Sequence, residues 1–535
     1  SLLSEHPKVS EKQICHQGWG YHDKITHIQS IKATYQENFL LASTTIIIFA
    51  IKIINNKNND MKTSRFIWRI FLVPLVTMLC AFFVAPLQAQ GQSVEAYVQM
   101  SADKTTLTFY YDTKRATREG TTWGIEEKKE YNERQYPAWV GTYENPDTTT
   151  TKAVVDASFA NFRPTSTASW FQYLKVLTNI EGLQYLNTTE VKNMGRMFSG
   201  CYALTSLNLS NFNTSNVTDM GRMFSGCSAL TTLDLKNFNT SNVTDMGRMF
   251  SGCFALTTLG LKNFNTSNVT DMSGMFTFCY SLTELDLSSF NTSNVTDMSG
   301  MFDYCPALTS LNLSSFNTSN VANMIAMFSG CSALKTLDLS NFNTKKVTDM
   351  YRMFDDCKAL TSLDLKNFNT QKVRAMSRMF AGCKALTSLN LKNFNTEKVE
   401  YMAEMFSSCE SLTTLDLSNF NTSNVKYMSE MFKNCANLST VVCDKVWSAP
   451  HSEQMFYGCV KLLGKAAFDT NKTSVEMANP NSGYFVATKP TALLSVFSLA
   501  RANGIYTLQG KRVRGNLQHL PAGIYIVNGK KVVVQ

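Results

Sequence analysis

Histidine and charged residues are both scarce in this sequence. The 535 residues include six His. Four of the six fall within the first thirty positions: His6, His16, His22 and His27. The rest of the chain therefore has almost no imidazole to serve as a zinc ligand or to activate a nucleophile. Asp, Glu, Lys and Arg together make up only 17% of the residues. These shortages argue against zinc-dependent and His-assisted catalysis.

The net charge of +9 gives no basis for nucleic-acid binding. Residues 1–60 contribute a net +1, and Lys62, Arg65 and Arg69 contribute +3, which leaves +5 for all remaining residues. Nucleic-acid recognition needs a concentrated basic patch rather than a weak positive balance spread over a mixed surface. We expect no nucleic-acid partner.

An export signal is predicted at residues 61–89. From Met61 the chain reads MKTSRFIWRIFLVPLVTMLCAFFVAPLQAQ, a basic start followed by a long apolar stretch and then Leu87-Gln88-Ala89 as the cleavage site. This order is typical of a secretory signal peptide cleaved after Ala89. The apolar stretch is also long enough for a retained transmembrane anchor, which is the alternative.

Residues 1–60 are interpreted as translated upstream sequence without structure. They begin with Ser and contain a second apolar run, FLLASTTIIIFAIKII, in front of the complete signal peptide. Export needs only one such segment, so we expect Met61 to be the true start. A peptide from before Met61 in the expressed protein would contradict this.

Cysteine recurs at a fixed interval of 26 residues. The positions are Cys201, Cys227, Cys253, Cys279, Cys305, Cys331, Cys357, Cys383, Cys409 and Cys435. The unit from 227 to 252 reads CSALTTLDLKNFNTSNVTDMGRMFSG. A repeat of this length is typical of a solenoid, in which each unit buries its apolar side only against its neighbours.

Each unit contains two apolar patterns separated by a polar turn. The first pattern, L-x2-L-x-L, ends in alternation and predicts a short strand. The second has helical spacing, at i, i+3, i+6 and i+7, and predicts a helical turn. In the unit from 227 to 252 the two sets are Leu230, Leu233, Leu235 and Val243, Met246, Met249, Phe250. Between them, NFNTSN is turn chemistry.

The predicted fold class is an α/β repeat solenoid, a leucine-rich-repeat-like stack with one short strand and one helical turn per rung. With strands ~4.8 Å apart, ten rungs would extend on the order of 50 Å. Small β-rich domains are expected at both ends. The expected divisions are a β-rich N-terminal cap (90–165), the solenoid (166–470), a linker (471–490) and a C-terminal β domain (491–535).

The ten matching units resemble the 26-residue bacterial surface-protein repeat of the DUF285 type. This repeat is grouped with the BspA-like leucine-rich repeat surface proteins of Bacteroidetes, and the match covers about 170–465, over half of the chain. The resemblance implies display at the cell surface. It also implies adhesion to host matrix proteins, more weakly, because the family is defined by its scaffold.

The segments on either side of the repeats lack the 26-residue pattern. In the N-terminal one, 93–98 and 107–111 read as strands that should dock on the first rung and cover its open end. In the C-terminal one, GIYTLQGKRV (504–513) and LPAGIYIVNGKKVVV (520–534) predict strands, with a hairpin at Asn528-Gly529. This tail resembles the C-terminal sorting domain of type IX secretion cargo. The alternative is a terminal β domain without a sorting role.

Three repeated features invite a chemical reading. The Cys residues, one per rung, could form disulfides or bind metal. Stacked rungs point these side chains in the same direction, which does not suit a disulfide, so we interpret the Cys as small, buried apolar residues. An outward column of Asp and Asn, including Asp234 and Asp286, could hold calcium, but Asn alternates and Gly260 interrupts, which favours a solvated face. The Asn-Thr-Ser and Asn-Val-Thr triplets match glycosylation sequons but fit turn ladders better.

No phosphate loop, nucleophile elbow or catalytic carboxylate pair stands apart from the repeat. We therefore predict that the chain is not an enzyme and has no catalytic, metal or cofactor site. An exported enzyme with its site in 90–165 is the rival hypothesis, and a deep pocket with converging polar groups there would support it.

The positions that break the repetition point to a binding patch. Phe254, Phe278, Tyr280 and Tyr304 stand near the Cys corner, where other rungs mostly have small or polar residues. Stacking would bring them together, and exposed aromatics are favoured binding anchors. The alternative is that they only cover the corner.

The function predicted from the sequence is an exported cell-surface repeat protein that binds other proteins non-covalently, as in adhesion. The expected partners are host matrix or other surface proteins and, through the tail, the outer-membrane secretion machinery. The expected location is the cell surface or the extracellular space. A structural surface-layer or spacer protein without a specific ligand is the alternative.

Overall fold

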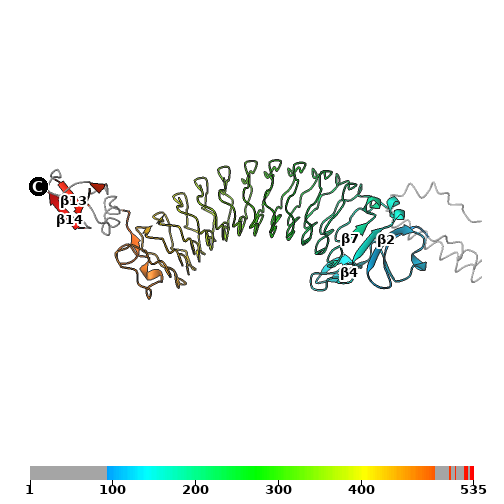
Figure 1. Ribbon diagram of the computed structural model, residues 1–535, viewed down its shortest axis with the longest axis horizontal. Coiled ribbons are helices and arrows are strands. Elements are labelled where there is room, and N and C mark those ends of the chain that lie inside the picture. Colours follow the sequence, from blue (N-terminus) through cyan, green and yellow to red (C-terminus); the bar gives the residue numbers. More distant parts are fainter. Residues whose placement is uncertain (1–92, 489–504, 508–511, 514–522, 528–529, 535) are drawn as a thin grey trace, which may run out of the picture. The chain divides into compact units, whose positions relative to one another are not determined.

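The computed structural model describes residues 93–488 and, near the C terminus, residues 505–507, 512–513, 523–527 and 530–534. In Figure 1 the repeated units stand side by side along the described chain. The interpretations made for 1–60 and for the signal peptide at 61–89 lie outside the described residues. Within the described part, no helix has the length and apolar character needed to span a bilayer.

A five-stranded sheet precedes the repeats and continues into them. Its strands lie in the order β3-β1-β2-β6-β7. Their bounds are Glu95–Met100 (β1), Thr106–Asp112 (β2), Thr121–Gly124 (β3), Lys152–Val155 (β6) and Asn179–Glu181 (β7). β1 pairs antiparallel with β2 and β3, whereas β2 with β6 and β6 with β7 pair in parallel. Because β7 belongs to the first rung, the N-terminal segment and the repeats share one sheet.

The remaining elements of this region are small. β4 (Lys128–Tyr131) and β5 (Arg134–Pro137) form an antiparallel hairpin. The connecting residues Asn132 and Glu133 both have positive φ, 48° and 60°, as in the tight turns that match strand twist. Three short 3₁₀ helices also belong to this region, η2 (Arg115–Thr117), η3 (Ala157–Asn161) and η4 (Leu183–Tyr185), and a fourth, η5 (Val475–Met477), follows the repeats.

An aromatic cluster closes the N-terminal end of the stack. Phe109 is fully buried, and four aromatic rings lie with their centroids 5.3–5.9 Å from its own. These rings belong to Trp139, Phe159, Trp170 and Phe171. Trp139 also donates its indole N–H to the Trp170 carbonyl at 2.9 Å. The first rung is therefore covered by apolar side chains rather than left open to water.

The rungs are joined by main-chain hydrogen bonds along their Met-Phe-Cys side. Arg248 N–H donates to the Ser273 carbonyl of the next rung at 2.7 Å, and Phe250 N–H donates to the Met275 carbonyl at 3.0 Å. Parallel bridges link neighbouring units one after another on this side. Every second N–H thus crosses to the next rung, which holds the units in register.

The helical turn predicted for each rung is not confirmed, and the described residues contain no α-helix. Residues 246–249 and 250–253 form two successive turns instead, each closed by a bond from the last N–H to the first carbonyl, at 3.1 and 3.2 Å. The third residues of these turns, Arg248 and Gly252, have φ of 55° and 75°. This is the type II geometry, and a left-handed residue does not continue an α-helix.

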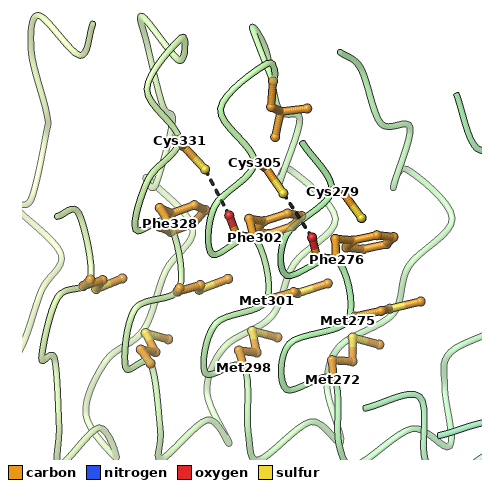
Figure 2. Close-up of a cluster of buried hydrophobic side chains, with 14 of the residues drawn as sticks. Met272, Met275, Phe276, Cys279, Met298, Met301, Phe302, Cys305, Phe328 and Cys331 are labelled. Carbon is orange, nitrogen blue, oxygen red and sulfur yellow. Dashed lines mark hydrogen bonds between the residues drawn. The ribbon is translucent and has the colours of Figure 1, made fainter. Parts of the chain in front are cut away.

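The apolar side chains of equivalent positions lie over one another in one buried core. Figure 2 shows Met272, Met275, Phe276 and Cys279 beside their counterparts in the next rung, and all four are fully buried. The Phe rings of this column stack nearly parallel, with centroids 5.6–5.8 Å apart from 198 to 432. The spacing of these rings thus exceeds the ~4.8 Å between strands that was expected from the sequence.

The Leu side of the rungs is less regularly bonded than the Phe side. Within the described array, strands occur there only at the two ends: β7 lies in the first rung, and β8 (Thr414–Asp416) and β9 (Thr440–Val442) pair in parallel in the last units. In the central units the Leu side chains are buried, or partly buried at Leu207 and Leu311, although their backbone forms no such strand. The predicted strand is therefore found only in the first rung and in the last units of the described stack.

The polar turn between the two halves is held by side chains that bond to the next rung. The Thr240 hydroxyl donates to the Asn265 carbonyl at 2.9 Å and accepts from the Asn265 N–H at 2.8 Å. Asn242 donates its amide to the Ser215 carbonyl of the preceding rung at 2.7 Å. These contacts agree with the interpretation of the triplets as turn ladders.

The C-terminal end of the stack is closed by β10 (Phe485–Val486), which pairs in parallel with β9. The Phe485 ring lies edge-on to Trp447 at 4.8 Å, and the Tyr484 ring lies edge-on to Phe456 at 5.3 Å. Both side chains are almost fully buried. The segment 471–490, expected to be a linker, thus contributes η5 and β10 to the end of the stack.

Four strands are described nearer the C terminus. They are β11 (Ile505–Thr507), β12 (Arg512–Val513), β13 (Gly523–Val527) and β14 (Lys530–Val534), in the antiparallel order β12-β11-β13-β14. Val527 pairs with Lys530, which is the register of a hairpin with a two-residue connection. The strands agree with the sequence pattern, whereas a role in type IX secretion stays a prediction.

Candidate functional site

Four exposed aromatic side chains gather on neighbouring rungs, and we call them the aromatic corner. Phe254, Phe278, Tyr280 and Tyr304 are 36–42% exposed. The rings of Phe254 and Tyr280 stack with centroids 4.8 Å apart. The Phe278 ring lies 6.0 Å from that of Tyr280 and 5.4 Å from that of Tyr304. The stack thus brings together all four residues of the patch proposed from the sequence; that they bind a partner stays a prediction.

Two residues of the aromatic corner occupy backbone positions that favour glycine. Phe278 and Tyr304 have φ of 60° and 54°. The equivalent residue, just before the repeated Cys, is a glycine in six other rungs: Gly200, Gly226, Gly252, Gly330, Gly382 and Gly458. A bulky residue in this region costs about 1–2 kcal/mol. Because Asp356, Ser408 and Asn434 keep the same φ at this position, the turn belongs to the repeat, and a binding role for the two aromatic residues stays a prediction.

An ion-pair network borders the aromatic corner. Arg352 donates to the Tyr304 hydroxyl oxygen at 3.3 Å and to the Asp355 carboxylate at 2.7 Å. Asp355 is almost fully buried and also meets Arg378, at 3.3 Å. Burial would lower the pKa of Arg352, but the hydrogen bonds to Tyr304 and Asp355 outweigh it and raise the pKa. Arg352 therefore stays charged and holds the Tyr304 side chain in place.

A second grouping, missed by the sequence analysis, lies where the β4–β5 hairpin meets the first rungs. It is a hollow of about 590 Å³ whose charged lining is Arg134, Arg196, Arg222 and Arg248. We call it the arginine hollow. Burial lowers the pKa of Arg222, and the charges of the other three arginines lower it further. The hollow is thus a cluster of like charges.

Part of the arginine hollow could have been found in the sequence. Arg196, Arg222 and Arg248 recur at the 26-residue interval, and their column is broken by Gly274 and Gly300. Because these arginines recur regularly, they were interpreted as part of the repeat structure rather than as a binding site. The fourth arginine, on the hairpin, reaches the same place only through packing that no local pattern indicates.

The family of the chain is assigned from the repeated units. The profile described as "Mycoplasma protein of unknown function, DUF285" matches residues 165–284, 279–388 and 358–468, which together cover more than half of the sequence. The chain belongs to the DUF285 family. This confirms the repeat type that the spacing of Cys, Leu and Phe suggested, and the family description assigns no activity.

Two solved structures are similar to this DUF285 chain. A leucine-rich repeat protein from Bacteroides ovatus is 18% identical, with 74% of this chain and 98% of that chain covered and a TM-score of 0.38. A leucine rich cell surface protein from Faecalibacterium prausnitzii is 17% identical, with 71% and 96% covered and a TM-score of 0.34. Such low TM-scores leave the family assignment to the sequence repeats. No curated protein matches the chain significantly.

The cysteine column of the DUF285 repeats is a column of buried thiols. All twelve described Cys are buried and free of disulfides. Cys305 donates its S–H to the Phe276 carbonyl of the previous rung at 3.1 Å, and Cys331 donates to the Phe302 carbonyl at 3.2 Å (Figure 2). Burial raises the pKa of the Cys305 thiol to about 12. The interpretation as buried, small apolar residues is confirmed, and these thiols are poor nucleophiles.

The outward Asp and Asn column is a solvated face. Asp234 accepts the Lys236 N–H at 3.1 Å and forms an exposed ion pair with the same Lys. Hydrogen bonds from Lys236 lower the pKa of Asp234. Among the described residues, no three His, Cys, Asp or Glu side chains are arranged to hold a metal ion. The column is therefore explained by turn geometry and surface charge.

The arginine hollow offers binding chemistry rather than acid–base chemistry. Arg, Tyr, Ser and Gln side chains line it, and no His, Cys or carboxylate is among them. It includes hairpin residues from the segment in which the rival hypothesis placed an enzyme site. Arginine stays protonated and binds anions but does not exchange protons near neutral pH. That the chain is not an enzyme remains a prediction.

Proposed function

We propose that this DUF285 chain is an exported repeat protein of the cell surface that binds other macromolecules through its aromatic corner, as an adhesin does. Export is supported by the sequence from Met61 to Ala89 and by the C-terminal segment that resembles a sorting domain. The proposed partners are host matrix proteins or proteins on other cells.

The observation that carries the proposal is the exposure of four clustered aromatic rings, two of which stand at strained backbone positions. Phe278 and Tyr304 keep positive φ where a glycine would relieve it. Aromatic side chains bury a large area at small entropic cost, and they dominate the binding energy of many interfaces. The charged border formed by Arg352 gives the apolar centre a polar rim, which is common in protein interfaces.

A structural spacer is the second candidate function. The ladder of cross-rung bonds and the closed ends favour a rigid, extended scaffold, and such a scaffold needs no ligand. The two functions differ in what the aromatic corner does. In a spacer its rings would contact only their own rungs.

The decisive experiment replaces the aromatic corner and leaves the scaffold unchanged. The variant carries Phe254→Ser, Phe278→Ser, Tyr280→Ser and Tyr304→Ser, and binding of the purified full chain to an immobilised laminin and collagen matrix is measured. Loss of four hot-spot residues should weaken binding at least ~10-fold, which corresponds to about 1.4 kcal/mol.

The matched control replaces four exposed aromatics on other rungs. It carries Tyr351→Ser, Tyr401→Ser, Tyr427→Ser and Tyr457→Ser, whose side chains are 38–51% exposed. Binding equal to that of the unmodified chain is expected. Equal loss in both variants would reject the aromatic corner, and absence of binding by the unmodified chain would favour the spacer. Labelling of intact cells with an antibody against the repeats tests surface display.

A further inference from the structure

We propose that the arginine hollow binds the acidic groups of an anionic oligosaccharide, one that carries carboxylate or sulfate groups. The hollow, about 590 Å³ in volume, lies between the β4–β5 hairpin and the first rungs. Its lining combines four arginines with tyrosine, serine and glutamine side chains. This site is separate from the aromatic corner, so it does not depend on the function proposed above.

The arginines of the hollow lack the partners that their counterparts further along the stack have. Arg352 and Arg378 stand at equivalent positions of later rungs, and both are paired with the buried carboxylate of Asp355. Among the described residues, Arg134, Arg196, Arg222 and Arg248 form no ion pair within 4.0 Å. Four clustered and unpaired guanidinium groups repel one another, and an anion would remove this repulsion.

The nearest carboxylates are engaged by the backbone. Asp219, Asp245 and Asp271 form a neighbouring column that shares a narrow space of about 160 Å³ with the arginines. Asp219 accepts the Gly221 N–H at 2.9 Å, and Asp245 accepts the Gly247 N–H at 2.8 Å. They reduce the positive charge on one side of the column but do not line the hollow itself.

The chain keeps room for the last arginine of the column. Gly274 stands where the three preceding rungs have arginine, and its φ is 57°. A Cβ atom added there would lie 2.9 Å from the Thr277 hydroxyl oxygen and 3.0 Å from Cγ of Arg248, so these two side chains would have to shift to accept it. The side chain of Arg248 therefore lies over the backbone of the next rung.

A buried amide supports the assignment of a ligand site. The side chain of Gln172 lines the hollow and is only 3% exposed. Its Oε1 atom has no hydrogen-bond partner among the described residues. An unsatisfied buried acceptor is costly, and a hydroxyl group of a ligand would satisfy it.

The lining favours a saccharide over an acidic peptide. Tyr143 is 76% exposed and meets Tyr173 edge-on at 6.1 Å, which leaves an aromatic face for the apolar face of a sugar ring. Ser199 and Ser225 offer hydroxyl groups. An extended peptide needs pockets for its side chains, and no aliphatic side chain lines the hollow. The arginines recur once per rung, so an oligosaccharide with regularly spaced acidic groups would meet more than one of them.

The test measures binding of defined oligosaccharides to the purified full chain by calorimetry. The probes are a sulfated heparin-derived octasaccharide, an oligogalacturonate, a neutral maltooligosaccharide and poly-glutamate. The sulfated or the carboxylated probe should bind, and the neutral one should not. Arg196→Gln with Arg222→Gln should weaken binding at least ~10-fold because two charge-assisted contacts are lost. The control, Arg374→Gln with Lys392→Gln, has the same charge change on other rungs and should bind normally.

Two further variants keep the test conclusive. If the double variant melts at a lower temperature, Arg134→Gln on the exposed hairpin replaces it, with a severalfold loss expected. Tyr143→Ala leaves every charge in place and should weaken saccharide binding severalfold. Unchanged binding by Tyr143→Ala, or tighter binding of poly-glutamate, would overturn the saccharide assignment in favour of an acidic peptide. No binding of either acidic saccharide would overturn the proposal.

Discussion

The interior of the stack and its Cys corner follow opposite rules. In the interior, Phe, Met and Cys are repeated with almost no change, and the Phe rings keep a spacing of 5.6–5.8 Å through most of the array. At the corner, the residue before Cys changes from Gly to Phe, Tyr, Asp, Ser or Asn from rung to rung. Every one of these residues has positive φ. The same left-handed turn thus carries side chains in a backbone conformation that favours glycine.

This difference separates what holds the fold from what the fold presents. A residue repeated in every rung is explained by the contact between rungs, whereas a departure that costs backbone energy needs another explanation. Phe276 and Phe278 lie two residues apart, the first fully buried and the second 36% exposed. Substitution of each of these two Phe residues therefore tests the distinction directly.

The largest expected effect comes from alkaline pH, which ionises the buried thiols of the interior. Burial raises the pKa of Cys253, Cys305 and Cys409 to about 12, against 9.0 for the unfolded chain. Their stabilisation is complete below pH 9 and is lost as pH rises toward 12. Each thiol costs about 1.4 kcal/mol per pH unit in this range, and many rungs titrate together. Circular dichroism should show cooperative unfolding above pH 9.

Thiol labelling supplies the control for the alkaline transition. At pH 8 a thiol reagent should modify none of the described Cys until denaturant is added. Cys15 and Cys80 lie outside the described residues, so up to two thiols are excluded from the comparison. Rapid labelling of more than two thiols in the native protein would contradict a closed interior.

The next effect in size is expected from Phe276→Ala. The Phe276 ring stacks on Phe250 and Phe302 with centroids 5.8 Å from each. Its removal leaves a cavity between three rungs, which should cost about 3–5 kcal/mol. Urea unfolding followed by fluorescence or circular dichroism checks this. A loss below ~1 kcal/mol would show that neighbouring rungs close the gap.

The smallest effect, with the opposite sign, is expected from Phe278→Gly. Glycine removes the strain of a φ of 60° but adds freedom to the unfolded chain, so we expect unchanged stability or a gain of up to about 1 kcal/mol. Binding to the laminin and collagen matrix should nevertheless fall. Destabilisation as large as that of Phe276→Ala would show that Phe278 belongs to the core.

The apolar columns could be predicted from the sequence because stacking converts a 26-residue period directly into contact. The local conformation could not, because Met246 and Met249 have the same spacing in a helix and in successive turns. Which of the two forms depends on Arg248 and Phe250, whose N–H groups bond to the next rung rather than along the chain. The aromatic corner was predictable for the same reason as the columns. The arginine hollow was not, because Arg134 reaches it through the hairpin.

The threonine at the polar turn has a consequence for how such a chain can change in length. Thr240 meets Asn265 through the same two hydrogen bonds with which Thr266 meets Asn291. Each central unit therefore bonds to the next through the same Thr–Asn contact, whichever residues it carries on its surface. Duplication or deletion of a whole central unit would therefore keep these Thr–Asn hydrogen bonds between neighbouring rungs. It would change the distance between the arginine hollow and the rungs on the C-terminal side of that unit.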